Sequence, residues 1–206
     1  SDTVQAVTLM RNQGCRVIIV LGGDGTHRLV AHACVDIPLV CISTGTNNVF
    51  PEFLESTVAG MAAGALAMGK VNRESMCLRN KRLLLNVNGA EEIPALVDIC
   101  VTSENWIGTR ALWKPEDFRE LYLAFAEPGA IGLSSIGSLL QPKARDAAEG
   151  LQIQMNASSS GGISVEAPIA PGLIAAVNVQ SCQPLLPEKP QLVNVSRGTV
   201  AFDGEN

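Results

Sequence analysis

The stretch Val17-Ile18-Ile19-Val20-Leu21-Gly22-Gly23-Asp24-Gly25-Thr26 decides the fold. Its apolar first half, which is mostly β-branched, predicts a buried strand. The three glycines that follow let the backbone turn sharply and approach a ligand without Cβ clashes. A helix predicted after the turn directs its free amides toward that ligand, which suits a phosphate group. We therefore predict a phosphate site at Gly22, Gly23, Gly25 and Thr26.

Asp24 stands in the centre of this turn. Because a carboxylate repels phosphate, Asp24 is predicted either to contact Mg²⁺ or to accept the proton of an attacking hydroxyl group. The alternative is a plain strand-to-helix turn in which Asp24 or Thr26 caps the helix. The next residue, His27, is interpreted as a solvent-facing helix residue rather than a phosphate ligand.

A second strand and polar turn follow the first. The apolar run 37–42 predicts a strand, and Ser43-Thr44-Gly45-Thr46-Asn47-Asn48 forms another small, glycine-containing turn. With helices expected at about 3–13, 26–34 and 55–68, this alternation predicts a parallel α/β sheet. Ligands of such sheets bind beyond the carboxyl ends of the strands. Gly45, Thr46, Asn47 and Asn48 are thus expected to share a crevice with the first turn, an Asx-type turn being the alternative.

The residue pattern of the chain changes after Gly69. Short apolar runs separated by Gly, Pro, Asn and Ser predict antiparallel strands at 83–88, 95–101, 151–155, 163–166, 173–179, 191–195 and 199–202. One helix is expected near 115–127, because Pro115 suits a first helical position and Phe118, Leu121, Tyr122 and Phe125 follow at helical spacing.

We accordingly predict an α/β domain over residues 1–69 and a β-rich domain over residues 70–206. The first domain would have a Rossmann-like parallel sheet, which we expect to be incomplete. The second would be an antiparallel β-sandwich with one inserted helix. Only about 14 residues precede the first strand, so we expect the chain to be a fragment of a longer protein.

The bulk composition excludes several function classes. The chain has 206 residues, 47% of them hydrophobic, and a net charge of −5 without a basic cluster, which argues against a nucleic-acid partner. No apolar stretch reaches the length of about 18 residues that spans a bilayer. The six cysteines form no CxxC pair and lie mostly in apolar runs, so we expect free thiols in a cytoplasmic protein rather than a metal site.

The motif Gly22-Gly23-Asp24-Gly25-Thr26 resembles the GGDGT signature shared by NAD kinases and by diacylglycerol and sphingosine kinases. The second turn resembles the G-T-x-N-D turn of the lipid kinases, with Asn48 in place of Asp. As a unit, residues 43–51 are most similar to the acetoin catabolism protein X group, which is described as NAD-kinase-like. Later segments follow the same order, among them Pro168-Ile169-Ala170-Pro171 and Val200-Ala201-Phe202-Asp203-Gly204-Glu205.

The resemblance implies a kinase that binds ATP and Mg²⁺ at the glycine turn and associates with copies of itself. It also implies a second acidic contact at Asp203 and Glu205, for which a solvated hairpin turn is the alternative. Asp98 stands where NAD kinases have a substrate-binding Glu. However, Val97 replaces the neighbouring Asn and cannot form a hydrogen bond, and Ile136-Gly137-Ser138-Leu139-Leu140 lacks the Thr and Tyr of G-S-T-A-Y. These departures argue against NAD as the substrate.

Two classes of function remain. The first is an ATP-dependent phosphotransferase that acts on a hydroxyl group of an unidentified small molecule, in which intact Asp24 is the catalytic residue. The second is a non-catalytic nucleotide-binding or NAD-binding regulatory protein, favoured by Val97 and the altered segment at 136–140. A NAD kinase or a diacylglycerol-type lipid kinase is a further alternative.

Overall fold

The computed structural model describes residues 1–90, 92–103, 114–155, 161–193 and 197–204. The chain divides into two compact units, Ser1–Asn80 and Lys81–Asn206. We describe each unit by itself.

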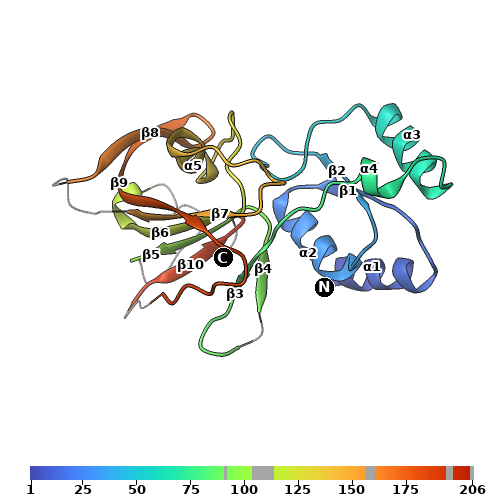
Figure 1. Cartoon of the computed structure of the whole chain (residues 1–206), viewed down its shortest axis with the longest axis horizontal. Helices are drawn as coiled ribbons and strands as arrows, with labels where there is room; N and C mark the ends of the chain where they lie inside the picture. Colours follow the sequence, from blue (N-terminus) through green and yellow to red (C-terminus); the bar gives the residue numbers. More distant parts are fainter. Residues whose placement is uncertain (91, 104–113, 156–160, 194–196, 205–206) are drawn as a thin grey trace. The chain divides into compact units, whose positions relative to one another are not determined.

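The N-terminal unit is an α/β arrangement built on two parallel strands (Figure 1). Its elements in chain order are α1 (Asp2–Asn12), β1 (Ile18–Gly22), α2 (Asp24–Cys34), β2 (Leu39–Ser43), α3 (Ser56–Ala67) and α4 (Arg73–Met76). The strands pair in parallel from Ile18 opposite Leu39 to Gly22 opposite Ser43. The predicted parallel sheet is therefore confirmed, and both polar turns leave the same edge of it.

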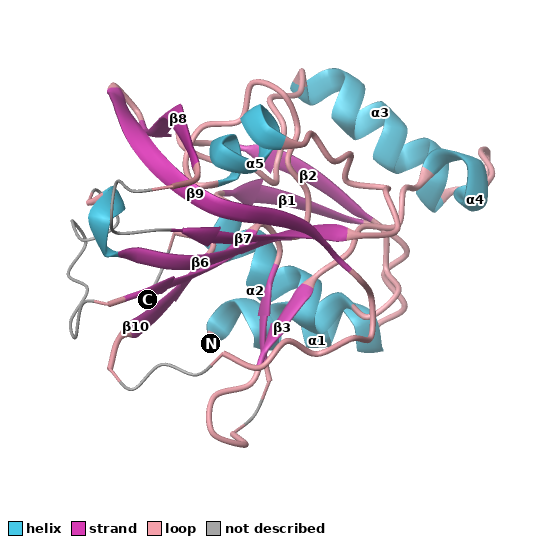
Figure 2. Ribbon diagram, turned by 60° about the vertical axis from the view of Figure 1, so that its left-hand side comes forward, coloured by secondary structure: helices cyan, strands magenta, loops and turns pink. Residues whose placement is uncertain are grey.

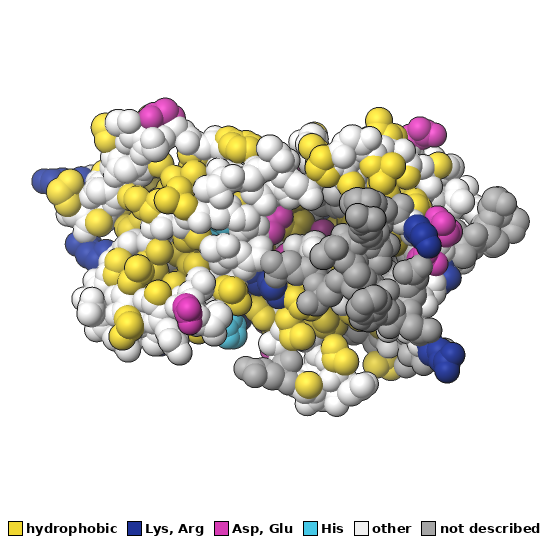
Figure 3. All heavy atoms as spheres, turned by 180° about the vertical axis from the view of Figure 1, so that it is seen from behind, with side chains coloured by type: hydrophobic (Ala, Val, Ile, Leu, Met, Phe, Trp, Pro, Cys, Tyr) yellow, Lys and Arg dark blue, Asp and Glu magenta, His cyan; other side chains and the backbone are white. Residues whose placement is uncertain are grey.

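One face of this small sheet carries the core of the unit. Ile18 and Val20 of β1 are buried with Val7 of α1 and Val30 of α2. The alternate residues of β1 remain accessible, with Ile19 46% and Leu21 66% exposed. Apolar side chains are accordingly visible at the surface of the chain, coloured yellow in Figure 3. The alternation of the strand thus places the core on the side of α1 and α2.

The C-terminal unit is dominated by one antiparallel sheet (Figure 2). Its strands are β5 (Asp98–Thr102), β6 (Phe118–Leu123), β7 (Gly150–Met155), β8 (Ile163–Ala170), β9 (Leu173–Leu185) and β10 (Thr199–Phe202). They lie in the order β10-β5-β6-β7-β9-β8. A separate antiparallel pair, β3 (Leu83–Leu85) and β4 (Ile93–Ala95), and one helix, α5 (Ser134–Leu140), complete the described elements.

Both faces of the six-stranded sheet are apolar. Leu121, Leu123 and Ile153 belong to a core that includes Ile136 of α5. Ile99 and Tyr122 belong to a second cluster, against which Leu83 and Leu85 of β3 pack. The antiparallel strands expected at 83–88, 151–155, 163–166, 173–179 and 199–202 are confirmed with shifted bounds, and the run expected at 95–101 is divided between β4 and β5. A full β-sandwich stays a prediction, because the described residues of this unit form one large sheet and one small pair. The strand expected at 191–195 is not formed at residues 191–193, and its remaining residues lie outside the described part of the chain.

The prediction of a helix near 115–127 is wrong. A short 3-10 turn at Pro115–Asp117 leads directly into β6. Phe118 pairs with Thr102 while Glu120 pairs with Val101, so Arg119 is an extra residue in a β-bulge. The bulge turns Phe118 to the same core as Leu121, and a strand thereby imitates the three-residue spacing of a helix.

The described part of the chain contains no helix with the length and apolar character that crossing a membrane requires.

An ion pair links the segment after β6 to the loop before β7. The Arg145 guanidinium donates Nη2–H to Glu127 Oε2 at 2.7 Å and lies over the Phe125 ring, 4.6 Å from its centre. Hydrogen bonds from Arg145 lower the pKa of Glu127, although partial burial opposes the shift. A lowered folded-state pKa stabilises the fold above the ordinary value of 4.5, and this stabilisation is lost as the pH falls below it.

We therefore expect the Glu127→Gln variant to lose less stability than the wild type between pH 5 and the acid limit of folding. Urea unfolding at a series of pH values measures this difference. Glu166→Gln removes an exposed carboxyl of β8 and is the control. Identical pH profiles for the wild type and Glu127→Gln would contradict the role assigned to this pair.

Candidate functional site

The glycine turn joins β1 to α2 at the carboxyl edge of the parallel sheet. Gly22 ends β1, Gly23 is the N-cap of α2, and Asp24 is its first residue. Gly23 has an extended backbone, with φ −97° and ψ −174°, which other residues adopt freely. Since Gly23 has no side chain, it cannot cap the first amides of α2, and these amides suit an anion.

Space, rather than an unusual dihedral angle, explains why glycine stands at positions 22 and 23. A Cβ on Gly22 would lie 2.7 Å from Thr26 Cβ, and a Cβ on Gly23 would lie 2.7 Å from Asn48 Oδ1. Both neighbours belong to the predicted site. The close approach that the glycines permit is therefore made by side chains of this chain.

The second turn folds against the first through Asn48. Its Nδ2 donates a hydrogen bond of 2.9 Å to Ser43 Oγ, which in turn donates to the Gly45 carbonyl at 3.0 Å. A Cβ on Gly45 would lie 3.0 Å from Asn48 Nδ2. The Asn48 amide thus lies between Gly23 and Gly45. The side chains of Thr46 and Asn47 are exposed beside it.

The Asp24 carboxylate ties the two turns together. It accepts the backbone N–H of Val49 at 3.0 and 3.2 Å and that of Phe50 at 2.8 Å. These bonds span 25 and 26 positions of sequence and connect the start of α2 to the segment after β2. The N-cap position of α2 is occupied by Gly23, and not by Asp24 or Thr26 as the alternative required. Asp24 positions the second turn.

His27 is buried, so its prediction as a solvent-facing residue is wrong. Its side chain is 0% exposed, and Nδ1 lies 2.8 Å from the Gly23 carbonyl oxygen. The ring packs near Phe50, with 6.2 Å between the ring centres. Among the described residues, Nε2 has no hydrogen-bond partner. The sequence offered no signal for this, because a lone histidine on a short helix carries no pattern.

In the C-terminal unit, Asp203 is a buried carboxylate that holds a backbone turn. It accepts the N–H groups of Leu96 at 2.9 and 3.0 Å, Val97 at 2.7 Å and Asp98 at 3.3 Å. Asp203 is 7% exposed and has φ of 49°. The solvated hairpin turn considered as an alternative is therefore not what the structure shows. Glu205 lies outside the described residues.

The residues near Asp203 include the predicted substrate contact. Asp98 begins β5 and is 6% exposed, and its carbonyl oxygen accepts the Asp203 N–H at 3.1 Å. Val97 is 1% exposed. The structure thus brings Val97, Asp98 and Asp203 together, while Asp24 and the two polar turns form a separate group in the N-terminal unit.

The donor set of the N-terminal group suits phosphate better than a bare metal ion. It offers the first amides of α2, the Thr26 hydroxyl and the Asn48 amide, with Asp24 as its carboxylate. The described residues contain no cluster of three or more His, Cys, Asp or Glu side chains that could hold a metal. Asp24 is the carboxylate of this group that would contact a magnesium ion bound to the phosphates of a nucleotide.

Comparison with known proteins agrees with this division. Residues 81–206 match the family model of the acetoin catabolism protein X C-terminal domain, and residues 1–71 match that of the ATP-NAD kinase N-terminal domain. The chain belongs to the acetoin catabolism protein X family. The resemblance inferred from the glycine motif is confirmed.

A relative in this family is acetoin catabolism protein X of Cupriavidus necator. It is 43% identical over 208 residues, which cover 99% of this chain and 58% of the relative. The chain therefore spans somewhat more than half the length of that protein. No solved structure gives a significant match.

The packing of Asn48 between the glycines can be tested by a double-mutant cycle. We expect Gly23→Ala to destabilise the chain because the new Cβ meets Asn48 Oδ1, and to be much less harmful when combined with Asn48→Ala. A coupling free energy of about 1–3 kcal/mol, measured by urea unfolding, is expected for side chains in contact. Any effect of alanine as an N-cap cancels in the cycle.

The control cycle pairs Asn48→Ala with Gly60→Ala, since a Cβ on Gly60 meets no atom within 4 Å. This pair is expected to be additive. Additivity between positions 23 and 48 as well would show that the glycine makes no room for Asn48.

The Asp203 carboxylate gives a second stability prediction. Asp203→Asn tolerates the left-handed backbone but replaces one acceptor oxygen by an NH₂ group that faces backbone N–H donors. The free energy of unfolding should fall by about 1–3 kcal/mol, measured by chemical denaturation. Asp146→Asn, at an exposed position, removes the same charge and should leave stability nearly unchanged. Equal effects of the two variants would mean that charge, rather than the three amides, explains the result.

Proposed function

We propose that this protein is an ATP-dependent phosphotransferase that transfers the terminal phosphoryl group of ATP to a hydroxyl group of a small molecule. The observation that carries the proposal is the Asp24 carboxylate, which holds the second polar turn against the uncapped start of α2. This arrangement gathers amide donors and one carboxylate at the carboxyl edge of the parallel sheet, where such sheets bind ligands. The match of residues 1–71 to the ATP-NAD kinase N-terminal domain supports it.

The residues of the site supply the hydrogen-bond donors that the phosphate groups of a nucleotide require. The amides of Gly25 and Thr26 lie in the first turn of α2, where the helix dipole favours negative charge. Gly22, Gly23 and Gly45 have no side chains that would cover these amides. Thr46 and Asn47 are exposed on the neighbouring turn and can reach a bound nucleotide. ATP supplies the phosphoryl group and carries Mg²⁺.

Asp24 is proposed to take part in the reaction as well as in holding the site. It is only partly buried, and its two oxygens accept the backbone amides of Val49 and Phe50. In the proposed reaction, the acceptor oxygen bonds to phosphorus as the bond to the departing ADP oxygen breaks. Asp24 receives the proton of the acceptor hydroxyl, or contacts the magnesium ion of the nucleotide.

The acceptor is proposed to be a molecule other than NAD. The buried Val97 side chain cannot form hydrogen bonds with a dinucleotide. The name of the Cupriavidus necator relative supports a link to acetoin catabolism, and acetoin itself carries a hydroxyl group. Asp98 stays a predicted substrate contact. Asp203 is poorly suited to be a second acidic contact, because its carboxylate already accepts three backbone amides.

The second candidate is a non-catalytic nucleotide-binding protein. The buried Val97 and the altered segment at 136–140 favour it, because they lack the hydrogen-bonding groups of a substrate site. The match of residues 1–71 to the ATP-NAD kinase N-terminal domain favours a NAD kinase as a further alternative, against which Val97 argues, and a lipid kinase stays a prediction from the sequence alone. Self-association and a cytoplasmic location stay predictions.

The full-length protein carrying Asp24→Asn distinguishes these candidates. We expect the wild type to phosphorylate acetoin or a related hydroxyl compound with ATP and Mg²⁺, and the variant to lose about 10²–10⁴-fold in rate. Product formation is measured by phosphorus NMR. The control is Asp2→Asn, at an exposed position of α1.

Thermal unfolding with ATP and Mg²⁺ completes the test, since a ligand of the native state raises the melting temperature. Stabilisation by ATP without turnover of any hydroxyl compound would reject the phosphotransferase in favour of the regulatory protein. The absence of stabilisation by ATP would reject both.

A further inference from the structure

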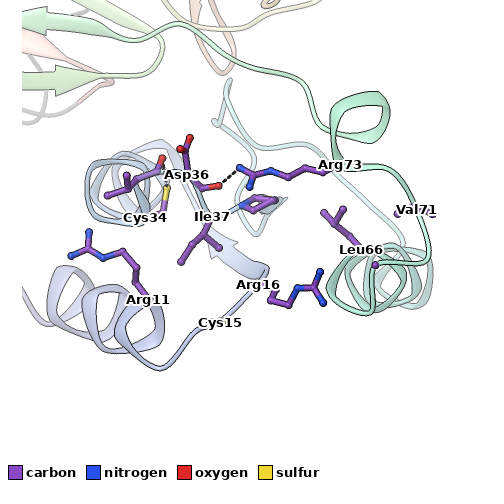
Figure 4. A pocket seen from close by; sticks show the side chains of 12 residues that line it. Arg11, Cys15, Arg16, Cys34, Asp36, Ile37, Leu66, Val71 and Arg73 are labelled. Atoms are coloured by element: carbon purple, nitrogen blue, oxygen red, sulfur yellow. Dashed lines mark hydrogen bonds between the residues drawn. The ribbon is translucent and has the colours of Figure 1, made fainter.

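A hollow of about 390 Å³ lies at the amino edge of the parallel sheet, opposite the glycine turn (Figure 4). It is bounded by the segment before β1, the segment before β2 and the end of α3. Its volume falls within the range of about 300–1,000 Å³ that small-molecule sites occupy. A strand of five residues separates this edge from the glycine turn, or about 16 Å. The hollow is therefore not part of the proposed nucleotide site.

Three arginines and one acidic residue line the hollow. Arg11, Arg16 and Arg73 carry the positive charges, and Asp36 carries the negative charge. In Figure 4, Arg73 reaches the backbone of Asp36, and the Arg11 guanidinium is directed away from Arg16. The net charge of the residues that line the hollow is positive, although residues 1–80 as a whole contain equal numbers of acidic and basic residues.

Two of the arginines each donate a hydrogen bond to a backbone carbonyl and have further N–H donors. Arg11 Nη1 donates to the Ala33 carbonyl at 3.0 Å, and Arg73 Nη2 donates to the Asp36 carbonyl. These carbonyls lie at and just beyond the end of α2, where basic side chains are favoured in any case. A guanidinium has five N–H donors, so each arginine keeps several for a ligand.

Arg16, in contrast, has no hydrogen bond to a backbone carbonyl of the described residues that would explain its position. It lies outside the helices, in the segment between α1 and β1, and is exposed. Among the described residues, it forms no hydrogen bond or ion pair. Its guanidinium lies against Gly69, where an added Cβ would be 3.5 Å from Nη2. In Figure 4 it points into the same space as Leu66.

The floor of the hollow is apolar. Ile37, Pro38, Leu66 and Val71 line it together with Cys34. An inorganic ion would leave this surface uncovered, whereas an organic molecule with an anionic end would cover it while its charge meets Arg16. A lining that is mostly apolar and carries a few charged groups is a feature of small-molecule sites.

We propose that this hollow binds a small organic anion, a carboxylate or phosphate monoester with a short apolar body, whose charged group pairs with Arg16 and Arg73. The inference is independent of the phosphotransferase reaction, because it uses none of the residues at the carboxyl edge. Binding depends on a charge-assisted contact at an exposed site and therefore weakens as salt increases.

The test uses the full chain labelled with ¹⁵N and titrated with butyrate or butyl phosphate in NMR. The amide signals of Arg16, Ile37 and Val71 are expected to shift, while those of residues 22–26 stay in place. Arg16→Gln should raise the dissociation constant about two- to fivefold, as loss of an ion pair at an exposed site implies. Arg82→Gln, which removes an exposed charge outside the hollow, is the matched control.

The two anions distinguish a carboxylate from a phosphate ligand, and either one binding at these residues supports the proposal. Inorganic phosphate and butanol test the two halves of the ligand, and each should bind more weakly than butyl phosphate. The proposal is overturned if neither organic anion shifts these signals, if Arg82→Gln weakens binding as much as Arg16→Gln, or if butanol binds equally well. The Asp24→Asn variant should retain this binding whether or not the protein is a kinase.

Discussion

The candidate site depends on the hydrogen bonds between the Asp24 carboxylate and the backbone amides of Val49 and Phe50. Two parallel strands with short turns would leave their carboxyl ends free to separate. The carboxylate at the start of α2 holds the second turn in place, and the Asn48 amide fills the space that the glycines leave. A few contacts between residues far apart in sequence thus convert two independent turns into one surface.

Asp203 plays a similar part in the other unit. Like Asp24, it belongs to a motif that resembles one of the kinases, and it accepts hydrogen bonds from consecutive backbone amides. A buried carboxylate would be unfavourable without such donors. In this protein, acidic residues of kinase-like motifs hold turns in their shapes, so their presence alone is weak support for catalysis. Asp24, which is only partly buried, is the one of the two that a ligand can approach.

Patterns within a few residues predicted much of the fold. The run 17–21 and its glycines identified β1 and the start of α2, and the second strand followed from its apolar residues. Contacts between distant residues could not be predicted in this way. Leu96 and Asp203 are 107 positions apart in sequence, so no local pattern predicts the hydrogen bond between them. The bulge at Arg119 gave a strand the residue spacing of a helix. Burial of β6 on both faces removed the alternation that would have revealed it.

The glycine motif also shows why a pattern can be recognised correctly while its physical reason is mistaken. Close approach by a ligand was the expected reason for Gly22 and Gly23, and the neighbours that crowd them are Thr26 and Asn48. Both explanations require glycine, so the sequence alone cannot separate them. They differ in what a ligand must do. If Asn48 stays where it is, phosphate meets an amide donor on a rigid surface. If phosphate needs the space itself, Asn48 must first leave Ser43, and nucleotide affinity would be reduced by the hydrogen bond that is broken.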